Sequence, residues 1–397
     1  MKKRSSGLPP IGPGDVHLAA HLFQGARLTL ARELRGLTRV ELAARVSKTP
    51  SAIGQFEVGR SRPDAKTLAA LSLALGIPLG FFARPSPSML GMQSCHLRTL
   101  RSASQRERKK LLSLGTLLCE LVAELDQYVE FPEERVTEAA QSPTDFDDIE
   151  RCANAVRKAW GLGQGPLPNV VKLLQSKGII VCLVPPTCRE VDAFSTWHDA
   201  RPLVFLVADK NGSRMRFDAG HELGHLVMHP DAEPGSPEVE REANRFAGAF
   251  LIPREAFLAE WPGWLNWDHI LEMKLRWKVS LAAIIHRAHD LGVLTDASYR
   301  RANIFLRRHG RDEPGEPPAE LPEFLSRALT LISDEVSVSE LAALQGLSAA
   351  DIEALVRGEM LEDSSDAGGL EPIQGELFGR HPVAPNNENH RTDSLDG

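Results

Sequence analysis

The stretch His221-Glu222-Leu223-Gly224-His225 decides how the rest of this chain is interpreted. Residues i and i+4 of a helix lie one above the other, about 6 Å apart, so the two imidazoles can bind one cation. Glu222 lies about 100° around the helix from His221 and can reach a water molecule at that cation without being a ligand. We therefore predict a helix over residues 213–228, with His221 and His225 as metal ligands and Glu222 as the general base.

A catalytic zinc needs a third protein ligand and an open position. His229 continues the i+4 series, but eight residues of helix place it about 12 Å from His221, too far for one shared ion. The longer metzincin spacing also fails, because only three residues separate His225 from His229. We expect His229 to be a residue of the helix end.

The next predicted helix, over residues 237–251, carries two candidates for the third ligand. Glu240 shares one stripe with small residues and with Asn244, whereas Glu242 lies off that stripe. Small residues allow the two helices to pack closely, so Glu240 points toward the histidines. We predict Glu240 as the third ligand and Asn244 as a hydrogen-bonding partner one turn later, with Glu242 as the alternative ligand. Zinc suits this set of nitrogen and oxygen donors, and manganese could replace it.

The segments around these helices indicate a small α+β unit. Residues 148–161 and 169–177 have helical patterns, and Gly178 ends the second before the β-rich run 179–184. A second strand is predicted over 203–208. His198, Arg214 and Arg216 lie near the predicted metal helix in sequence and could stabilise an oxyanion, but solvent exposure is an equal alternative and we assign them no role.

Linked motifs in this unit resemble the ImmA/IrrE family of metallopeptidases over roughly residues 146–265. They are Asp192-Ala193-Phe194, the run from Arg214 to His229, the run from Glu240 to Ala247, and Leu251-Ile252-Pro253. The resemblance implies a gluzincin-like peptidase that cleaves transcriptional repressors, with ligands at His221, His225 and Glu240. A common family form has alanine where this chain has Gly220, a change that we do not expect to alter the chemistry.

The N-terminal part of the chain predicts an all-helical unit of five short helices over residues 17–83. Thr38 and Glu41 form a capping box at the start of one helix. Thr49 caps the next, with a proline at its first position, where the missing N–H costs nothing. Asp64 caps a further helix, which Gly76 closes.

Two of these helices are joined by a short turn, a geometry that places the second helix in a DNA major groove. Gln55 faces outward on that second helix, and glutamine suits bidentate contact with adenine. Basic residues around the helix would contact phosphates and position it. The predicted DNA-binding residues are Lys48, Thr49, Ser51, Ala52, Gln55, Arg60 and Arg62. The alternative is a helical protein-binding module with an incidental excess of positive charge.

The stretch from Gly36 to Ile77 resembles the xenobiotic-response-element family of lambda-repressor-like helix-turn-helix domains. The resemblance as a whole extends beyond these motifs to about 65 residues and implies dimeric binding to a roughly palindromic double-stranded DNA operator. Gly54 stands where the family often has a serine, so one phosphate contact is expected to be missing. Many relatives of the peptidase family carry such a domain at their N-terminus, which supports both resemblances.

Charge is distributed unevenly between a basic head and an acidic body. The 397-residue chain has a net charge of -7, yet residues 1–85 hold 13 basic and 5 acidic side chains, so +8, which leaves -15 for the remainder. This asymmetry suggests a polyanionic partner for the head alone. No apolar run reaches the roughly 20 residues that cross a bilayer, and the five cysteines are scattered without CxxC pairs. We expect a cytoplasmic protein without a membrane partner.

Four other segments complete the expected organisation. We predict a disordered leader (1–16) and tail (361–397), a linker with an amphipathic helix (84–145), and a helical C-terminal region (266–360). Leucines recur at a/d spacing between Leu111 and Tyr128, which is typical of a helix packed on its own chain or of a short dimerisation seam. Within the C-terminal region we expect a Pro/Glu linker at 313–322 and a tight turn at Gly346-Leu347-Ser348, in a helical support or dimer element.

Together these features predict a multidomain chain: an all-α lambda-repressor-like helix-turn-helix head, a small α+β gluzincin-like metallopeptidase domain and a helical C-terminal region. The leading hypothesis is a homodimeric transcriptional regulator with a zinc endopeptidase that cleaves a helix-turn-helix repressor or another regulatory protein. The alternative is a transcription factor whose peptidase-like domain senses a ligand or a metal without turnover. Retention of Glu222 favours the enzyme, because a purely structural zinc site needs no base.

Overall fold

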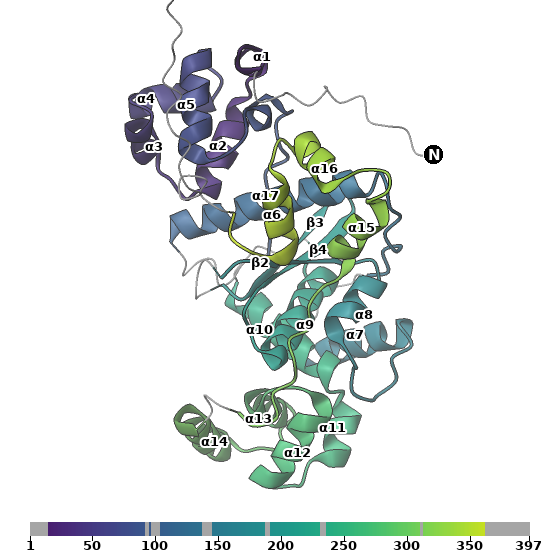
Figure 1. Cartoon of the computed structure of the whole chain (residues 1–397). Coiled ribbons are helices and arrows are strands. Elements are labelled where there is room, and N and C mark those ends of the chain that lie inside the picture. Colours follow the sequence, from purple (N-terminus) through teal and green to yellow (C-terminus); the bar gives the residue numbers. More distant parts are fainter. Residues whose placement is uncertain are drawn as a thin grey trace, which may run out of the picture.

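A computed structural model of the chain describes residues 15–91, 95–96, 104–136, 145–186, 191–230, 236–309 and 313–361. The leader and the tail that we predicted to be disordered lie outside these residues, except for positions 15, 16 and 361. One of the five cysteines, Cys188, also lies outside them. Figure 1 shows the helical head at one end, a sheet in the middle, and helices α11 to α14 at the opposite end. No helix in the described part is long and apolar enough to cross a membrane.

The head contains the five α-helices that its sequence predicts, followed by a short 3-10 helix. The Thr38–Glu41 capping box is present, and the Thr49 and Asp64 side chains cap their helices as predicted. Gly25 shows how closely the head is packed, because a Cβ atom there would lie 2.3 Å from the backbone oxygen of Phe56. The elements are α1 (Val16–Leu22), α2 (Gly25–Leu34), α3 (Arg39–Arg45), α4 (Pro50–Glu57), α5 (Ala65–Leu75) and η1 (Leu79–Ala83).

Helix α6 (Gln105–Leu125) joins the head to the sheet. Its a/d leucines are buried within the same chain, so this seam packs on its own chain, the first of our two alternatives. On the side of the head, Arg27 of α2 makes two hydrogen bonds to the Glu120 carboxylate. On the side of the sheet, a Cβ atom at Gly115 would lie 3.5 Å from the Phe194 ring.

The sheet has the strand order β1-β3-β4-β2. Strands β2 (Ile180–Val184) and β4 (Arg201–Val207) are parallel, and β3 (Ala193–His198) lies antiparallel to both β4 and the two-residue β1 (Cys95–His96). We did not predict β3. It forms a hairpin with β4 through Asp199 and Ala200, which both have positive φ angles, of 48° and 61°. Alanine rarely occupies such a turn, so the usual hairpin signal is absent from the sequence.

The sheet separates two apolar cores, because successive side chains of a strand point to opposite faces. One face shares its core with the head, α6 and the C-terminal helices α15 (Phe324–Ile332), α16 (Val338–Gln345) and α17 (Ala349–Arg357). The other face packs against the helices that carry the metal motif and those around them. These are α7 (Phe146–Ala159), α8 (Val170–Ser176), α9 (Gly212–Met228), α10 (Pro237–Leu251), α11 (Arg254–Glu260), α12 (Trp267–Trp277), α13 (Leu281–Asp290) and α14 (Asp296–His309).

The helical C-terminal region that we predicted as one unit is thus divided between the two cores. Helices α12 to α14 belong to the core of α9, and α15 to α17 belong to the core of the head. Gly346, in the predicted turn between α16 and α17, has a φ of 64° and packs on the backbone of Phe81 in the head. This turn therefore supports the head within the same chain.

The segment 313–322 is bound to the body and is more than the Pro/Glu linker that we predicted. The fully buried Nζ of Lys274 lies 3.0 Å from Glu313 Oε2 and 2.9 Å from Glu316 Oε2. Glu320 is buried, where it pairs with Arg216 and accepts the backbone N–H of Val170 at 2.6 Å. Composition alone could not reveal this, because the cationic partners come from distant helices.

Candidate metal centre

Helices α9 and α10 pack closely where the metal motif lies. A Cβ atom at Gly224 would lie only 3.0 Å from the Phe246 ring, so glycine permits this approach. The approach brings His221 and His225 of α9 to Glu240 of α10, and one donor atom from each lies within 4.8 Å of the others. All three residues were predicted from the sequence, and the structure places them together.

The donor atoms of these residues face one another. His221 Nε2 and His225 Nε2 are 3.0 Å apart. Glu240 Oε2 lies 3.3 Å from His221 Nε2, and Glu240 Oε1 lies 3.7 Å from His225 Nε2. At 3.7 Å the second contact is too long for a hydrogen bond, and Oε1 is buried without a hydrogen-bond partner among the described residues.

Asn244 orients the first histidine. Its Oδ1 atom lies 3.0 Å from His221 Nδ1. An amide oxygen only accepts hydrogen bonds, so Nδ1 carries the ring proton and Nε2 presents a lone pair. Asn244 therefore occupies the place that the helical stripe predicted for it.

A second chain of hydrogen bonds orients His225 through His229. Burial lowers the pKa of His229 to about 4, so its ring is neutral near pH 7. Its Nε2–H donates to Glu242 Oε2 at 2.8 Å, which leaves Nδ1 to accept from His225 Nδ1–H at 3.2 Å. The Nε2 atom of His225 then also presents a lone pair. Such carboxylate–histidine pairs commonly orient metal ligands.

The sequence placed His229 correctly at the end of α9 but missed this contact. The spacing of four residues between His225 and His229 could have indicated this contact, because residues i and i+4 of a helix are neighbours. Glu242, our alternative third ligand, contacts His229 and lies outside the group of three donors.

The donor set fits a divalent cation. Two nitrogen lone pairs that face each other at 3.0 Å repel unless a positive charge lies near both, and none of the described residues donates a hydrogen bond to Glu240 Oε1. Two imidazoles and one carboxylate form a common ligand set of catalytic zinc. The residues present therefore fit zinc, and N/O donors also accept manganese.

Glu222 lies at this centre without belonging to the donor group. It is 3% exposed, and Ser195 Oγ donates a hydrogen bond of 2.6 Å to its Oε2. Burial raises the pKa of Glu222 to about 8, although the Ser195 hydrogen bond acts in the opposite direction. Ser195 lies on β3, the strand that we did not predict, and no local sequence pattern distinguishes it.

The three side chains considered for oxyanion stabilisation have other partners. Arg216 is buried and pairs with Glu320. Arg214 Nε lies 3.0 Å from Asp218 Oδ1 on the same helix. His198 Nε2, at the end of β3, lies 3.6 Å from Asp199.

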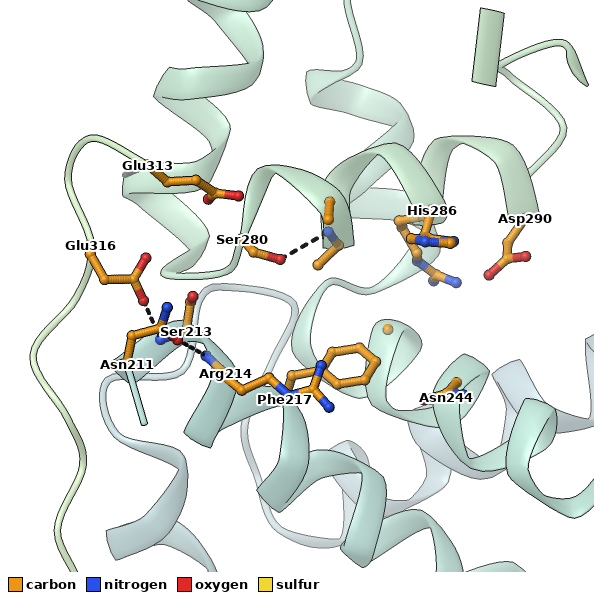
Figure 2. A pocket seen from close by; sticks show the side chains of 14 residues that line it. Asn211, Ser213, Arg214, Phe217, Asn244, Ser280, His286, Asp290, Glu313 and Glu316 are labelled. Carbon is orange, nitrogen blue, oxygen red and sulfur yellow. Dashed lines mark hydrogen bonds between the residues drawn. The ribbon is translucent and has the colours of Figure 1, made fainter. Parts of the chain in front are cut away.

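A cavity of about 800 Å³ opens beside the centre. Figure 2 shows Arg214 and Phe217 of α9 on one side, Asn244 of α10 on another, and residues of α13 facing them. Asn244 is shared with the centre, and Phe217 lies one helical turn before His221. The cavity is therefore adjacent to the group of three donors.

The predicted DNA-binding residues are presented on the surface of the head. Ile53 and Phe56 of α4 are buried in the core, and Ala52 is half-buried. Arg62 is exposed and donates to the backbone oxygen of His21 at 2.7 Å. The other predicted contacts, Lys48, Thr49, Ser51, Gln55 and Arg60, are exposed.

Arg39 is a further basic residue beside α4, and it was not among the predicted DNA contacts. Its guanidinium lies 3.8 Å from the position of a Cβ atom on Gly54 and donates to Glu57 Oε2 at 2.6 Å. Glu57 is buried and also binds Arg32. Half of the Arg39 side chain remains exposed, so a cation is held next to the glycine that replaces the usual serine.

Comparisons with known proteins agree with both resemblances. Residues 174–289 match the peptidase M78 family model, described as the IrrE N-terminal-like domain, and residues 28–82 match a helix-turn-helix model. The chain is also 40% identical over 55 residues to multiprotein-bridging factor 1 of Candida albicans, and 34% identical over 55 residues to that of Eremothecium gossypii. Each match covers 14% of this chain and 36% of the relative, so the chain spans about a third of the length of these relatives. The chain thus combines a helix-turn-helix domain with a metallopeptidase-type domain.

Proposed function

We propose that this protein is a transcriptional regulator whose body is a zinc-dependent endopeptidase that acts on another regulatory protein. The observation that carries the proposal is the convergence of His221, His225 and Glu240 beside a buried carboxylate, Glu222, which is not part of the donor group. A structural zinc site needs no such base, whereas peptide hydrolysis does.

The roles of the residues follow from their contacts. His221, His225 and Glu240 would hold zinc, or manganese in its place, and the bound ion would supply the Lewis acidity that polarises a peptide carbonyl. Ser195 occupies Glu222 Oε2, so the other oxygen, Oε1, takes the proton of the attacking water and returns it to the leaving amine. Asn244 and His229 keep the two imidazoles in the tautomer that presents Nε2.

The partners follow from the head and from the family resemblance. The exposed side chains of α4 and the basic residues around it would bind a DNA operator, with the protein acting as a cytoplasmic homodimer. The family resemblance favours a helix-turn-helix repressor as the protein substrate. The alternative, a peptidase-like domain that senses a ligand or metal without turnover, predicts no cleavage at all.

Glu222→Gln separates these two functions. The variant should retain the metal, the fold and operator binding, because Glu222 is outside the donor group, and should lose cleavage by about 10²- to 10⁴-fold. The protein and the variant would each be co-expressed with helix-turn-helix repressors encoded beside it, with cleavage read by gel and derepression by promoter output. His269→Ala, on α12 away from the centre, is the matched control. If Glu222→Gln regulated the promoter in the same way as the parent protein, the sensor hypothesis would stand and the peptidase hypothesis would be rejected.

A further inference from the structure

Helix α14 presents a basic face to solvent. Its inner side is fixed by Ala302, which is fully buried, and by Tyr299, whose hydroxyl lies 2.7 Å from His286 Nδ1 on α13. At about 100° per residue, the exposed side chains that follow Tyr299 fall within one arc of about 160°. They form the α14 face, which consists of Arg300, Arg301, Ile304, Phe305, Arg307 and Arg308.

The four arginines of the α14 face form a basic surface on an acidic body. Among the described residues none of the four forms a salt bridge, and Arg301 donates to Ser298 Oγ on its own helix at 3.0 Å. Residues 86–397 as a whole carry a net charge of -15. Ile304 lies between the arginines and is 51% exposed, so the face also offers an apolar contact.

The opposite charge is exposed around the turn between α15 and α16. Residues 324–361 hold six acidic and two basic side chains, so -4. Asp334 and Glu335 of the turn form no salt bridge with the described residues. Leu331, four residues before Glu335, is 75% exposed. With two residues of α16 these side chains form the acidic corner, of which all members are exposed: Leu331, Asp334, Glu335, Glu340 and Leu344.

The α14 face and the acidic corner lie at opposite ends of one chain. Figure 1 shows α14 at the end far from the head and α16 on the side of the head, where Gly346 packs on Phe81. Two copies placed side by side in opposite directions would bring each α14 face to the acidic corner of the other copy. The two equal contacts close the pair, whereas a single contact would leave both surfaces open and continue into a filament. Burial of both surfaces also brings the pair closer to the roughly 1,200 to 2,000 Å² of specific interfaces.

We propose that the α14 face binds the acidic corner of a second copy of this chain, in a two-fold pair that forms without DNA. Arginine–carboxylate contacts orient the two copies, and Ile304 and Leu331 supply apolar contact. The pair places the two heads at opposite ends. It is therefore distinct from the operator-bound homodimer proposed above, whose heads must lie about 34 to 36 Å apart or a multiple of this distance.

Charge reversal tests the pairing on the full chain. Arg300→Glu with Arg307→Glu reverses the α14 face, and Asp334→Arg with Glu335→Arg reverses the acidic corner. Each double variant alone should have a dissociation constant at least tenfold above that of the parent protein, because like charges then face each other. An equimolar mixture of the two should recover the association, since each α14 face again meets a corner of opposite charge. Sedimentation equilibrium measures the dissociation constants.

Arg151→Glu with Lys158→Glu is the matched control. Both residues are exposed on α7, with the same spacing of seven residues and the same change of charge as the α14 variant. They belong to neither surface, so the control should keep the dissociation constant of the parent protein. An increase from about 0.1 M to about 1 M salt shortens the Debye length from about 10 Å to about 3 Å and should weaken the parent pair.

A parent protein that stays monomeric at low salt would overturn the proposal, and so would a mixture of the two variants that does not associate. Circular dichroism of each variant shows whether it is folded, and recovery in the mixture requires that both are. If Arg300→Glu with Arg307→Glu instead weakened binding to random duplex DNA and left self-association unchanged, α14 would be a DNA-binding surface and the proposal would be wrong. None of these measurements depends on the metal centre, so Glu222-dependent cleavage stands or fails separately.

Discussion

The Nδ1 atoms of His225 and His229 lie 3.2 Å apart, and the far side of His229 binds Glu242. This pair explains how a residue that cannot reach the metal position can still control it. The Nδ1 atom of His229 must accept a hydrogen bond from His225, because the ring proton of His229 is donated to the Glu242 carboxylate. The arrangement fixes His225 with its Nε2 lone pair toward His221 and Glu240.

His229→Ala should therefore weaken zinc binding by about 10- to 100-fold, the usual cost of losing the partner of a ligating histidine. The ligands themselves remain, so saturating zinc should restore occupancy. Competition with a chelator of known affinity measures the dissociation constant. His269→Ala, in a partly buried position on α12, should leave the affinity unchanged. Equal affinities of His229→Ala and the parent protein would refute an orienting role.

Glu240 and Glu242 allow a matched test of the third ligand. They lie two residues apart on α10, but only Glu240 lies within the donor group. Glu240→Gln should lose most of the bound zinc after dialysis, because the amide removes the only anionic donor of the group. Glu242→Gln should retain zinc at close to one ion per chain, with a weaker affinity through His229. Elemental analysis of the zinc content of both variants decides which glutamate is the ligand. If Glu242→Gln lost zinc and Glu240→Gln retained it, Glu242 would be the third ligand instead of Glu240.

Ser195→Ala should change the pH dependence of cleavage. The hydroxyl binds Glu222 Oε2 and favours the charged carboxylate, so its loss raises the pKa of Glu222. A general base acts in its deprotonated form, and the acidic limb of the kcat/KM profile should therefore move to higher pH, by about 1 unit for a hydrogen bond to a charged group. Ser195→Thr keeps a hydroxyl and should restore the original limb. A uniform loss of rate at every pH in Ser195→Ala would instead indicate a packing role.

The proximity of the three candidate ligands could be predicted from the sequence because their signals are local. The i, i+4 spacing places His221 above His225 on any helix, and the stripe of small residues turns Glu240 toward them. The starts of helices could also be predicted from the sequence, because a capping residue such as Thr49 accepts a hydrogen bond from a backbone N–H within its own turn.

Ser195 was missed for a different physical reason. Its strand lacks a clear apolar alternation, and Asp199-Ala200 is an uncommon hairpin turn, so β3 left no local signal. The contact with Glu222 exists only after β3 pairs with β4 and packs on α9. Glu320 is a similar case, because its buried partners, Arg216 and the start of α8, are more than 100 residues away along the chain.

Two exposed residues of the head, Gln55 and Arg60, allow base recognition to be separated from phosphate contact. Gln55 and Arg60 are both exposed, but Gln55 lies within α4 and Arg60 follows its end. Gln55→Ala should relax the base preference at one position of each operator half-site, since glutamine pairs with an adenine edge. Arg60→Ala should weaken binding to all sequences alike and reduce the salt dependence of the binding constant by about one counterion per subunit.

The measurement compares the affinities of both variants for the operator and for random DNA over a series of salt concentrations. Lys66→Ala removes an equal charge from the exposed start of α5 and is the control for a general loss of positive charge. If Gln55→Ala and Arg60→Ala weaken specific and random binding by the same factor, α4 does not read bases. A helical module that binds protein would then be the better description of the head, and the basic excess of residues 1–85 would need another partner.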